Sequence, residues 1–373
     1  MSVPAWLLRA VEGAVAAEAP SLSQRGMRAG LALAEAGYGI AVRLRSAAFA
    51  AGVLKSHRLP CRVVCVGNLT TGGTGKTPTV IRLAESLSAA GGRPCILLRG
   101  YGRAGCDPAV VSDGRSVGLG WREAGDEAVL LARRLPGVPV VVGADRVAAG
   151  RLALARFSPD TLLLDDGFQH RRLARDVDLV LLDGTDPFGG GRLLPRGRLR
   201  EPVAGLGRAQ AVLVTRADQV ADRNALRRWI VAAGATCPIG WAIHRPTRLW
   251  DLRTGATNAP AGLQGRLAFA VSGIANPAGF HRTLEALGAS LVGRLAYPDH
   301  HPFGAADRQA IGEAARAAGA ECVVVTEKDA VRLEADLPVG LPTLALGVSL
   351  EVVEGDDLLA AALGIPLRRA IHG

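Results

Sequence analysis

Aromatic residues are scarce in this sequence of 373 residues, because Phe, Trp and Tyr together make up only 4% of it. The sequence contains no RNP-type aromatic motif that would stack nucleic-acid bases. No window of 18 uncharged apolar residues occurs either, so no membrane-spanning helix is predicted. The N-terminus lacks a basic leader before its apolar stretch, so no cleavable signal peptide is expected.

Cysteine motifs are missing as well. The six cysteines show no CxxC or zinc-finger spacing, and several lie in apolar runs where a small buried thiol is the ordinary explanation. They are Cys61, Cys65, Cys95, Cys106, Cys237 and Cys322. We infer a reducing compartment.

The composition favours a large globular protein with an anionic partner. A chain that is 49% hydrophobic can bury a substantial core, as two domains or as one large domain with an appended lobe. The net charge of +10 indicates attraction to nucleic acid, an acidic lipid surface or a phosphorylated substrate, although a GC-rich genome also explains frequent arginine. Without a nucleic-acid-binding motif we expect no nucleic-acid partner, and no obligate protein partner is evident.

Residues 24–54 have apolar side chains at helical spacing, interrupted by Arg28, Glu35, Arg43 and Arg45. A helix of this kind can lie in a membrane interface, with its cations at anionic headgroups. It can equally pack as an amphipathic helix on the domain core. The sequence leaves both interpretations open.

A phosphate-binding loop follows a short apolar strand at residues 62–67. Glycines in such a loop let backbone N–H groups converge on phosphate oxygens, while Lys76 neutralises the β and γ phosphates and the Thr77 hydroxyl binds magnesium. The GxxxxGK[ST] pattern fails only at its first position, which is Thr70. The residues predicted to hold ATP are Thr70, Thr71, Gly72, Gly73, Thr74, Gly75, Lys76 and Thr77.

A second strand, at residues 161–165, ends in the carboxylates Asp165 and Asp166. A phosphate-binding loop of this class requires an acidic magnesium ligand at the end of a neighbouring strand. Adjacent residues on a strand point to opposite faces, so only one of the two is expected to face the Mg²⁺. A solvated pair at the end of the strand is the alternative interpretation.

At DDGFQH (165–170) the sequence resembles the tetraacyldisaccharide 4'-kinase (lipid A 4'-kinase) family. The other segments that carry the resemblance are VGNLTTGGTGKTP (66–78), LRGYGR (98–103), GDEAVLLARR (125–134), LPRGRLREP (194–202), SGIANPAGF (272–280), YPDHHPF (297–303) and VTEKDAVRL (325–333). They occur in the family's order and cover most of the chain. The loop with Thr70 is itself the family's form.

The resemblance implies a kinase of lipid A biosynthesis that transfers the γ-phosphoryl group of ATP to the 4'-hydroxyl of an acylated glucosamine disaccharide 1-phosphate. It also implies a peripheral protein at the cytoplasmic face of the bacterial inner membrane. Asp126 matches the family's base and His300 its partner, with Lys76 as the catalytic cation. The alternatives are that Asp126 and Glu127 only cap a helix, and that His301 takes the place of His300.

Several other charged residues are candidates for ligand contact. Arg99 and Arg103 follow a strand, at a position where loops of open α/β sheets meet ligands. A basic run with Glu201 is interpreted either as a site for the substrate phosphate or as solvated surface. The run consists of Arg192, Arg196, Arg198 and Arg200. Lys328 and Asp329 end another strand, which suits a site facing the nucleotide.

The alternation of apolar runs and helices predicts an α/β fold, a P-loop NTPase-like doubly wound parallel sheet with a smaller C-terminal α/β lobe and an N-terminal amphipathic helix. Strands are predicted near 62–67, 94–98, 138–142, 161–165, 178–183 and 211–215, then near 267–271, 322–326 and 343–346, and a helix at 79–90. The segment after Trp241 is polar and predicts a hairpin linker. We expect three parts: 1–60 helical, 61–244 nucleotide-binding core, 245–373 linker and lobe.

Two rival functions follow from single features. Val214–Asp218 (VTRAD) follows an apolar strand and is similar to the guanine-reading motif of GTPases, which favours a GTPase or metallochaperone, although Arg replaces the usual Lys. A non-catalytic, membrane-docked nucleotide-binding module is the second rival. Turnover of ATP or GTP with and without the lipid disaccharide separates the three.

Overall fold

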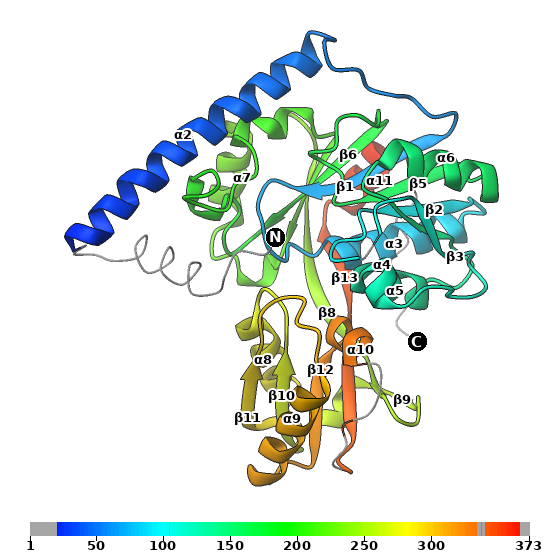
Figure 1. Ribbon diagram of the computed structural model, residues 1–373, viewed down its shortest axis with the longest axis vertical. Helices are drawn as coiled ribbons and strands as arrows, with labels where there is room; N and C mark the ends of the chain where they lie inside the picture. The colour runs from blue at the N-terminus through cyan, green and yellow to red at the C-terminus, as the bar shows by residue number, and fades with distance from the viewer. Residues whose placement is uncertain (1–20, 104, 334–336, 338–339, 366–373) are drawn as a thin grey trace.

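One sheet of 13 strands runs through the whole molecule (Figure 1). The computed structural model describes residues 21–103, 105–333, 337 and 340–365. The strand order is β11-β10-β12-β13-β8-β7-β6-β1-β5-β2-β4-β3, with β9 paired to β8. Pairing is parallel except where β13 meets β8, β8 meets β9 and β3 meets β4.

The strands are β1 (Arg62–Asn68), β2 (Pro94–Leu98), β3 (Ala109–Ser112), β4 (Val140–Val142), β5 (Thr161–Asp165), β6 (Val177–Asp183), β7 (Ala211–Thr215), β8 (Ile239–Asp251), β9 (Thr257–Asn258), β10 (Leu267–Ser272), β11 (Ser290–Ala296), β12 (Cys322–Thr326) and β13 (Thr343–Glu354). The α-helices are α2 (Leu22–Ala50), α3 (Lys76–Ala89), α4 (Trp121–Ala124), α5 (Asp126–Arg134), α6 (Arg146–Phe157), α7 (Arg223–Ala232), α8 (Pro277–Ala286), α9 (Ala305–Ala317), α10 (Glu327–Leu333) and α11 (Asp356–Leu363).

The sheet is covered on both faces, as the continuous apolar strands require. In β1, Val64 and Val66 pack on the face covered by α3 and α5, while Val63 and Cys65 pack on the face covered by α6 and α7. This alternation follows from the two-residue period of a strand. The expected doubly wound α/β fold is confirmed. We call the part built on β1 to β7 the core lobe.

The C-terminal lobe comprises β10 to β12 with α8, α9 and α10, and it has apolar clusters on both faces of its strands. Figure 1 shows β8 and β13 running from the core lobe into this second lobe. Their antiparallel pairing extends from Leu344 opposite Asp251 to Glu354 opposite Trp241. The two lobes therefore share one ladder of backbone hydrogen bonds.

The linker prediction after Trp241 was wrong for its first half, because β8 continues to Asp251 and only then turns into the short hairpin with β9. Likewise, β13 extends well beyond the predicted 343–346. Both strands carry partly exposed polar residues beyond their buried stretches, and a search for apolar runs does not detect such residues. Pro246, which argues against a strand, lies at a register shift that removes the need for its N–H.

The remaining predictions of elements mostly agree with the structure. The other predicted strands occur within a few residues of their expected ends, and the predicted helix at 79–90 is α3. The short edge strand β3 and the partly exposed β11 were missed. The predicted division at residue 244 falls inside β8, and the three-part organisation stays a prediction.

Helix α2 crosses above the core lobe (Figure 1). Its N-terminus is capped by Ser21, and its inner side is tied down by Glu35, which accepts from the Leu193 backbone N–H and pairs with Arg196. Of the predicted segment 1–60, residues 1–20 lie outside the described residues. Within the described ranges, the structure contains no helix with the length and apolarity to span a membrane.

Candidate active site

The phosphate-binding loop, residues 70–77, connects β1 to α3. Gly75 has a φ of 83°, and a Cβ added there would lie 2.6 Å from Nε2 of His244 on β8, so only glycine fits. The Lys76 and Thr77 pair begins α3, whose N-terminal N–H groups favour an anion. Sequence and local backbone thus agree on an anion-binding turn.

The end of strand β7 and the residue after it hold this loop in place. Thr215 donates its hydroxyl to the Thr74 carbonyl at 3.1 Å, and Arg216 donates to the Gly73 carbonyl at 3.0 Å. Because a trans peptide holds the next N–H opposite to its carbonyl, these bonds turn the N–H groups of Thr74 and Gly75 away from β7. The VTRAD segment therefore contacts the loop through its Thr and Arg.

The two carboxylates after β5 have different surroundings. Arg200 donates to both carboxylate oxygens of Asp166, at 2.7 and 2.9 Å, and Lys76 Nζ lies 3.7 Å away. Although burial raises it, these cations hold the pKa of Asp166 below its usual value. Asp165 is buried, and neither of its carboxylate oxygens has a hydrogen-bond partner among the described residues.

Asp165 is the better fit for a divalent cation. Burial, and then the negative charge of Glu127, raise the pKa of Asp165 to about 7. A cation would relieve both the desolvated charge and the orphaned oxygens. Magnesium commonly keeps several waters and uses one or two protein oxygens beside nucleotide phosphates, so Thr77 and Asp165 suffice as its protein ligands.

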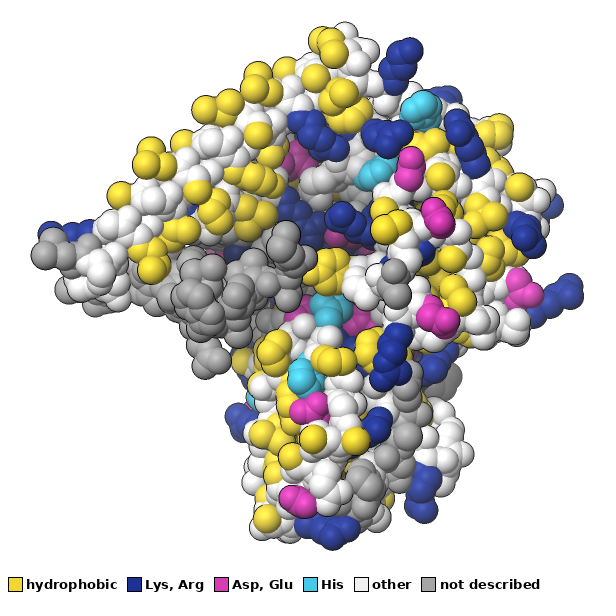
Figure 2. Space-filling model, viewed as in Figure 1, with side chains coloured by type: hydrophobic (Ala, Val, Ile, Leu, Met, Phe, Trp, Pro, Cys, Tyr) yellow, Lys and Arg dark blue, Asp and Glu magenta, His cyan; other side chains and the backbone are white. Residues whose placement is uncertain are grey.

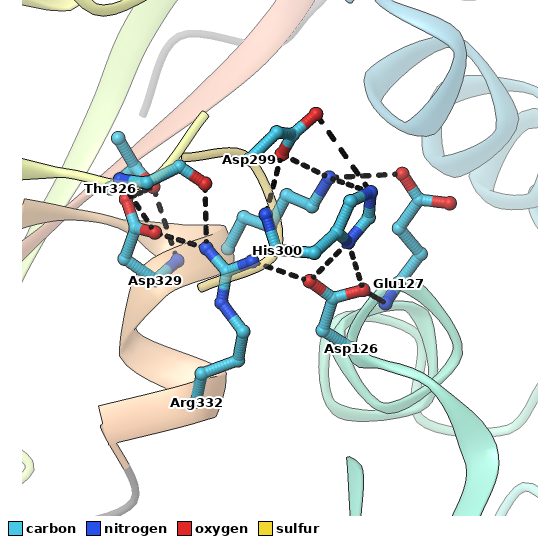
Figure 3. A network of polar contacts seen from close by, with 9 residues as sticks. Asp126, Glu127, Asp299, His300, Thr326, Asp329 and Arg332 are labelled. Atoms are coloured by element: carbon cyan, nitrogen blue, oxygen red, sulfur yellow. Dashed lines mark hydrogen bonds and ion pairs between the residues drawn. The ribbon is translucent and has the colours of Figure 1, made fainter. Parts of the chain in front are cut away.

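Asp126 and His300 form a close pair (Figure 3). The Nδ1 atom of His300 lies 2.9 and 3.1 Å from the two carboxylate oxygens of Asp126. The pair joins the lobes, since Asp126 opens α5 of the core lobe and His300 belongs to the loop after β11. His300 adopts a left-handed backbone with φ of 62°, and Tyr101 packs against its ring.

The Asp126 carboxylate has further partners. Arg332 of α10 donates to it at 3.0 Å, and the Glu127 backbone N–H donates at 2.9 Å. Although burial raises it, the hydrogen bond from His300 and the charges of Lys328, His300 and Arg332 lower the pKa of Asp126 below its ordinary value. Its oxygens are therefore held as a hydrogen-bonded anion.

Arg332 is itself fixed on the C-terminal lobe. Its guanidinium donates to Asp329 and, at 2.9 Å, to the Gly273 carbonyl. Asp329 in turn accepts from the Gly273 N–H at 3.0 Å and from the Thr326 hydroxyl at 2.5 Å. Figure 3 shows Arg332 between Asp329 and Asp126. One buried cation thus links α10 to the first turn of α5.

A single cavity of about 1770 Å³ brings these groups together. Its lining includes the loop from Thr71 to Thr77, both carboxylates after β5, Asp126 and His300. Tyr38 and Arg45 of α2 line it as well. Figure 2 shows Lys or Arg and Asp or Glu side chains gathered in the hollow between α2 and the core lobe. The cavity therefore has the loop at one end and the Asp126–His300 pair at the other; the end with the pair is called the proton-accepting end for the role predicted for it.

The remaining predicted residues have partners of their own. His301 faces Asp307 at 3.0 Å and stacks on Tyr297, away from Asp126, which favours His300 over His301 for the pair. Glu201 is buried and accepts from Gln169 and Arg208.

The arginines of the basic run differ as well. Arg196 and Arg198 form ion pairs with Glu35 and Asp186, whereas Arg200 and Arg99 line the cavity. Arg103 donates instead to the backbone carbonyls of nearby loop residues.

Sequence reasoning missed Arg332, His244 and the loop-supporting roles of Thr215 and Arg216. The signal for Arg332 was its spacing of three residues from Asp329 on one helix, which places both on one face. No local signal identified His244, because its neighbour Gly75 is distant in sequence and meets it only in the folded sheet.

Comparison with known proteins gives consistent matches. Residues 27–364 match the family model described as Tetraacyldisaccharide-1-P 4'-kinase. A tetraacyldisaccharide 4'-kinase from Anaeromyxobacter sp. (strain K) is 46% identical over 344 residues, covering 91% of each chain. The enzyme of that name from Geobacter sulfurreducens is 41% identical over 332 residues, covering 89% of this chain and 91% of the relative.

One solved structure resembles the present structure over nearly the whole length of both chains. It is LpxK from Aquifex aeolicus, crystallised in complex with ATP, with a TM-score of 0.75 and 31% sequence identity. The match covers 91% of this chain and 98% of the other.

Proposed function

This chain belongs to the tetraacyldisaccharide 4'-kinase family, and from that premise we propose that it transfers the γ-phosphoryl group of ATP to the 4'-hydroxyl of tetraacyldisaccharide 1-phosphate in lipid A biosynthesis. The observation that carries the proposal is the one cavity lined by both the phosphate-binding loop and the Asp126–His300 pair. Phosphoryl transfer requires the triphosphate and the proton acceptor to face the same acceptor oxygen.

We assign the proton-accepting atom to Nε2 of His300. The Asp126 carboxylate already accepts hydrogen bonds from His300, Arg332 and the Glu127 backbone, so it has little capacity left for a substrate hydroxyl. Its role is to orient the imidazole and to stabilise the imidazolium that forms. This exchanges the roles expected from the resemblance, in which Asp126 was the base and His300 its partner.

At the other end, Lys76 and the N–H groups of the loop bind the β and γ phosphates. Thr77 and Asp165 are the ligands we assign to magnesium, while Asp166 with Arg200 holds Lys76 in place. When bound, Mg²⁺ supplies charge neutralisation at the phosphate oxygens. The 4'-oxygen attacks phosphorus as the bond to the β–γ bridging oxygen breaks, and the hydroxyl proton passes to His300.

The acceptor enters beneath α2. The cavity wall there is formed by Tyr38 and Arg45 of α2 together with Arg146 and Arg200. These three arginines suit the 1-phosphate of the sugar, which is the anion that distinguishes this substrate from a neutral glycolipid.

We assign α2 to an anionic membrane surface. Leu33, Ile40 and Leu44 are exposed at spacings of seven and four residues, and they form one apolar stripe on α2. Figure 2 shows hydrophobic side chains along the outer side of this helix. A stripe over the acceptor entrance suits a peripheral protein at the cytoplasmic face of the bacterial inner membrane, where it would receive a lipid substrate.

The decisive experiment mixes purified protein in detergent with labelled ATP, magnesium and tetraacyldisaccharide 1-phosphate. We expect label in the lipid, none in simpler sugars, and little transfer from GTP. Lipid-independent hydrolysis of GTP would favour a GTPase. Nucleotide binding without any transfer would leave a membrane-docked binding module as the function.

A further inference from the structure

Lys328 lies in the first turn of α10, outside the loop and the pair described above, yet it lines the same cavity. Its Nζ atom lies 3.3 Å from Glu127 Oε1, 3.3 Å from Asp299 Oδ1 and 3.3 Å from Nε2 of His300. An ammonium group has three N–H donors, so these contacts account for all of them. None is short for a charge-assisted hydrogen bond.

From this geometry we infer that Lys328 is a further catalytic residue, whose ammonium group binds the transferring γ-phosphoryl group once the acceptor hydroxyl has taken its place at His300. The inference rests on the proposed kinase function and assigns that reaction a second cation, opposite Lys76.

The contacts of His300 fix which of its nitrogens carries the hydrogen. An ammonium can only donate and a carboxylate can only accept, so Nδ1 must be protonated towards Asp126 while the Nε2 lone pair faces Lys328. An imidazolium would point a second N–H at the ammonium group, which is unfavourable. Lys328 thus favours the one neutral tautomer that can accept a proton.

Binding of the acceptor releases one donor of Lys328. The Nε2 atom has a single lone pair, so it cannot accept from Lys328 and from a sugar hydroxyl at once. When the hydroxyl binds Nε2, one N–H of Lys328 is left beside the oxygen that attacks phosphorus. The phosphoryl oxygens are then the nearest new acceptors for this N–H group.

Glu127 connects Lys328 to the phosphate end of the cavity. This carboxylate accepts from Lys328, and its negative charge is also the largest charge effect on Asp165, the magnesium ligand we assign. One carboxylate therefore acts electrostatically on both Lys328 and Asp165. Although burial lowers it, the Glu127, Asp126 and Asp299 carboxylates raise the pKa of Lys328 above its ordinary value, so the cation persists throughout the reaction.

The step is balanced without a proton from Lys328. The 4'-oxygen forms its bond to phosphorus, the bond to the leaving β-phosphate oxygen breaks, the hydroxyl proton moves to Nε2, and the electron pair leaves with ADP. The ammonium group contributes charge only, as negative charge spreads over the phosphoryl oxygens.

The test compares Lys328→Met and Lys328→Arg with Arg134→Met. Arg134 of α5 pairs with Glu327 of α10 at 2.8 Å, so its loss removes another ion pair between the same two helices without a contact to His300. We expect Lys328→Met to lower kcat by about 100-fold with a KM for ATP within about threefold, and Lys328→Arg to recover part of kcat. Arg134→Met should stay within about threefold of the wild type.

Binding of a transition-state analogue separates a catalytic role of Lys328 from a role in docking the two helices. Lys328→Met should bind ADP–aluminium fluoride with the acceptor at least about tenfold more weakly, yet bind ATP as the wild type does.

Equal losses in Lys328→Met and Arg134→Met would overturn the inference, as would unchanged aluminium fluoride affinity in a folded variant. Absence of lipid phosphorylation by the wild type would instead overturn the proposed function, so the two failures are distinct. Thermal melting with and without ATP identifies folded variants.

Discussion

The two ends of the cavity are built in different ways. The phosphate-binding end comes from one contiguous turn, residues 70–77, and from strand ends of the core lobe. The proton-accepting end combines Asp126 of the core lobe with His300 and Arg332 of the C-terminal lobe, which are separated from it by 174 and 206 residues. The phosphate-binding loop needs one lobe, whereas the Asp126–His300 pair forms only when both lobes meet.

This contrast predicts a division of kinetic effects. Changes at the loop should weaken ATP binding, because the loop contacts the nucleotide in the ground state. Changes at the lobe junction should lower kcat with ATP affinity preserved, because those groups act on the proton and on the developing charge.

Lys76→Ala should have the largest effect and abolish turnover. The variant loses a cation that we assign to the γ-phosphoryl group in both ground and transition states, which corresponds to several kcal/mol of barrier, or a loss of about 1000-fold or more. Single-turnover kinetics and calorimetry with ATP measure it. Residual activity above one tenth of the wild type would remove Lys76 from the reaction.

Asp126→Ala and His300→Ala should each lower kcat by about 100-fold, while ATP still binds. Because the two residues act as a unit, the double variant should be about as slow as the slower single variant. Asp126→Asn serves as the size-matched control. Multiplicative losses of about 10,000-fold in the double variant would show that the two side chains act independently.

Arg216→Ala should raise the KM for ATP by about tenfold with kcat within about threefold, because Arg216 orients the Gly73 peptide and is itself held by Asp183. Calorimetric affinity for ATP gives the same information without turnover. Arg216→Lys keeps a cation without the planar group, so its KM for ATP should lie between those of the wild type and Arg216→Ala. A drop in kcat at unchanged KM would contradict the proposed division.

His244 should make stability depend on pH without affecting the rate at pH 7. Burial and the Arg216 charge lower its pKa to about 4, so the folded state resists protonation more than the unfolded state does. Stability is therefore lost as pH falls from about 6.5 towards 4, by about 1 kcal/mol at pH 6. Denaturant titrations at pH 7.5 and 6 should show this loss in the wild type and a smaller one in His244→Gln.

The sequence predicted what depends on local patterns. The loop at residues 70–77, the carboxylates after β5 and most of the buried strands are contiguous signals, and the resemblance supplied Asp126 and His300. What it missed depends on the assembled sheet: β8 and β13 carry partly exposed polar residues beyond their buried stretches, and Arg332 meets Asp126 only across the lobe junction. The orphaned oxygens of Asp165 likewise distinguish it from Asp166 only in three dimensions.

The unbroken passage of β8 and β13 through both lobes has a consequence for dissection of the chain. A cut after residue 244 would sever β8 in the middle and leave each half with exposed, unpaired strand edges. Separately expressed halves should therefore aggregate, and the intact chain should denature in a single cooperative transition, because the lobes hold their central ladder in common.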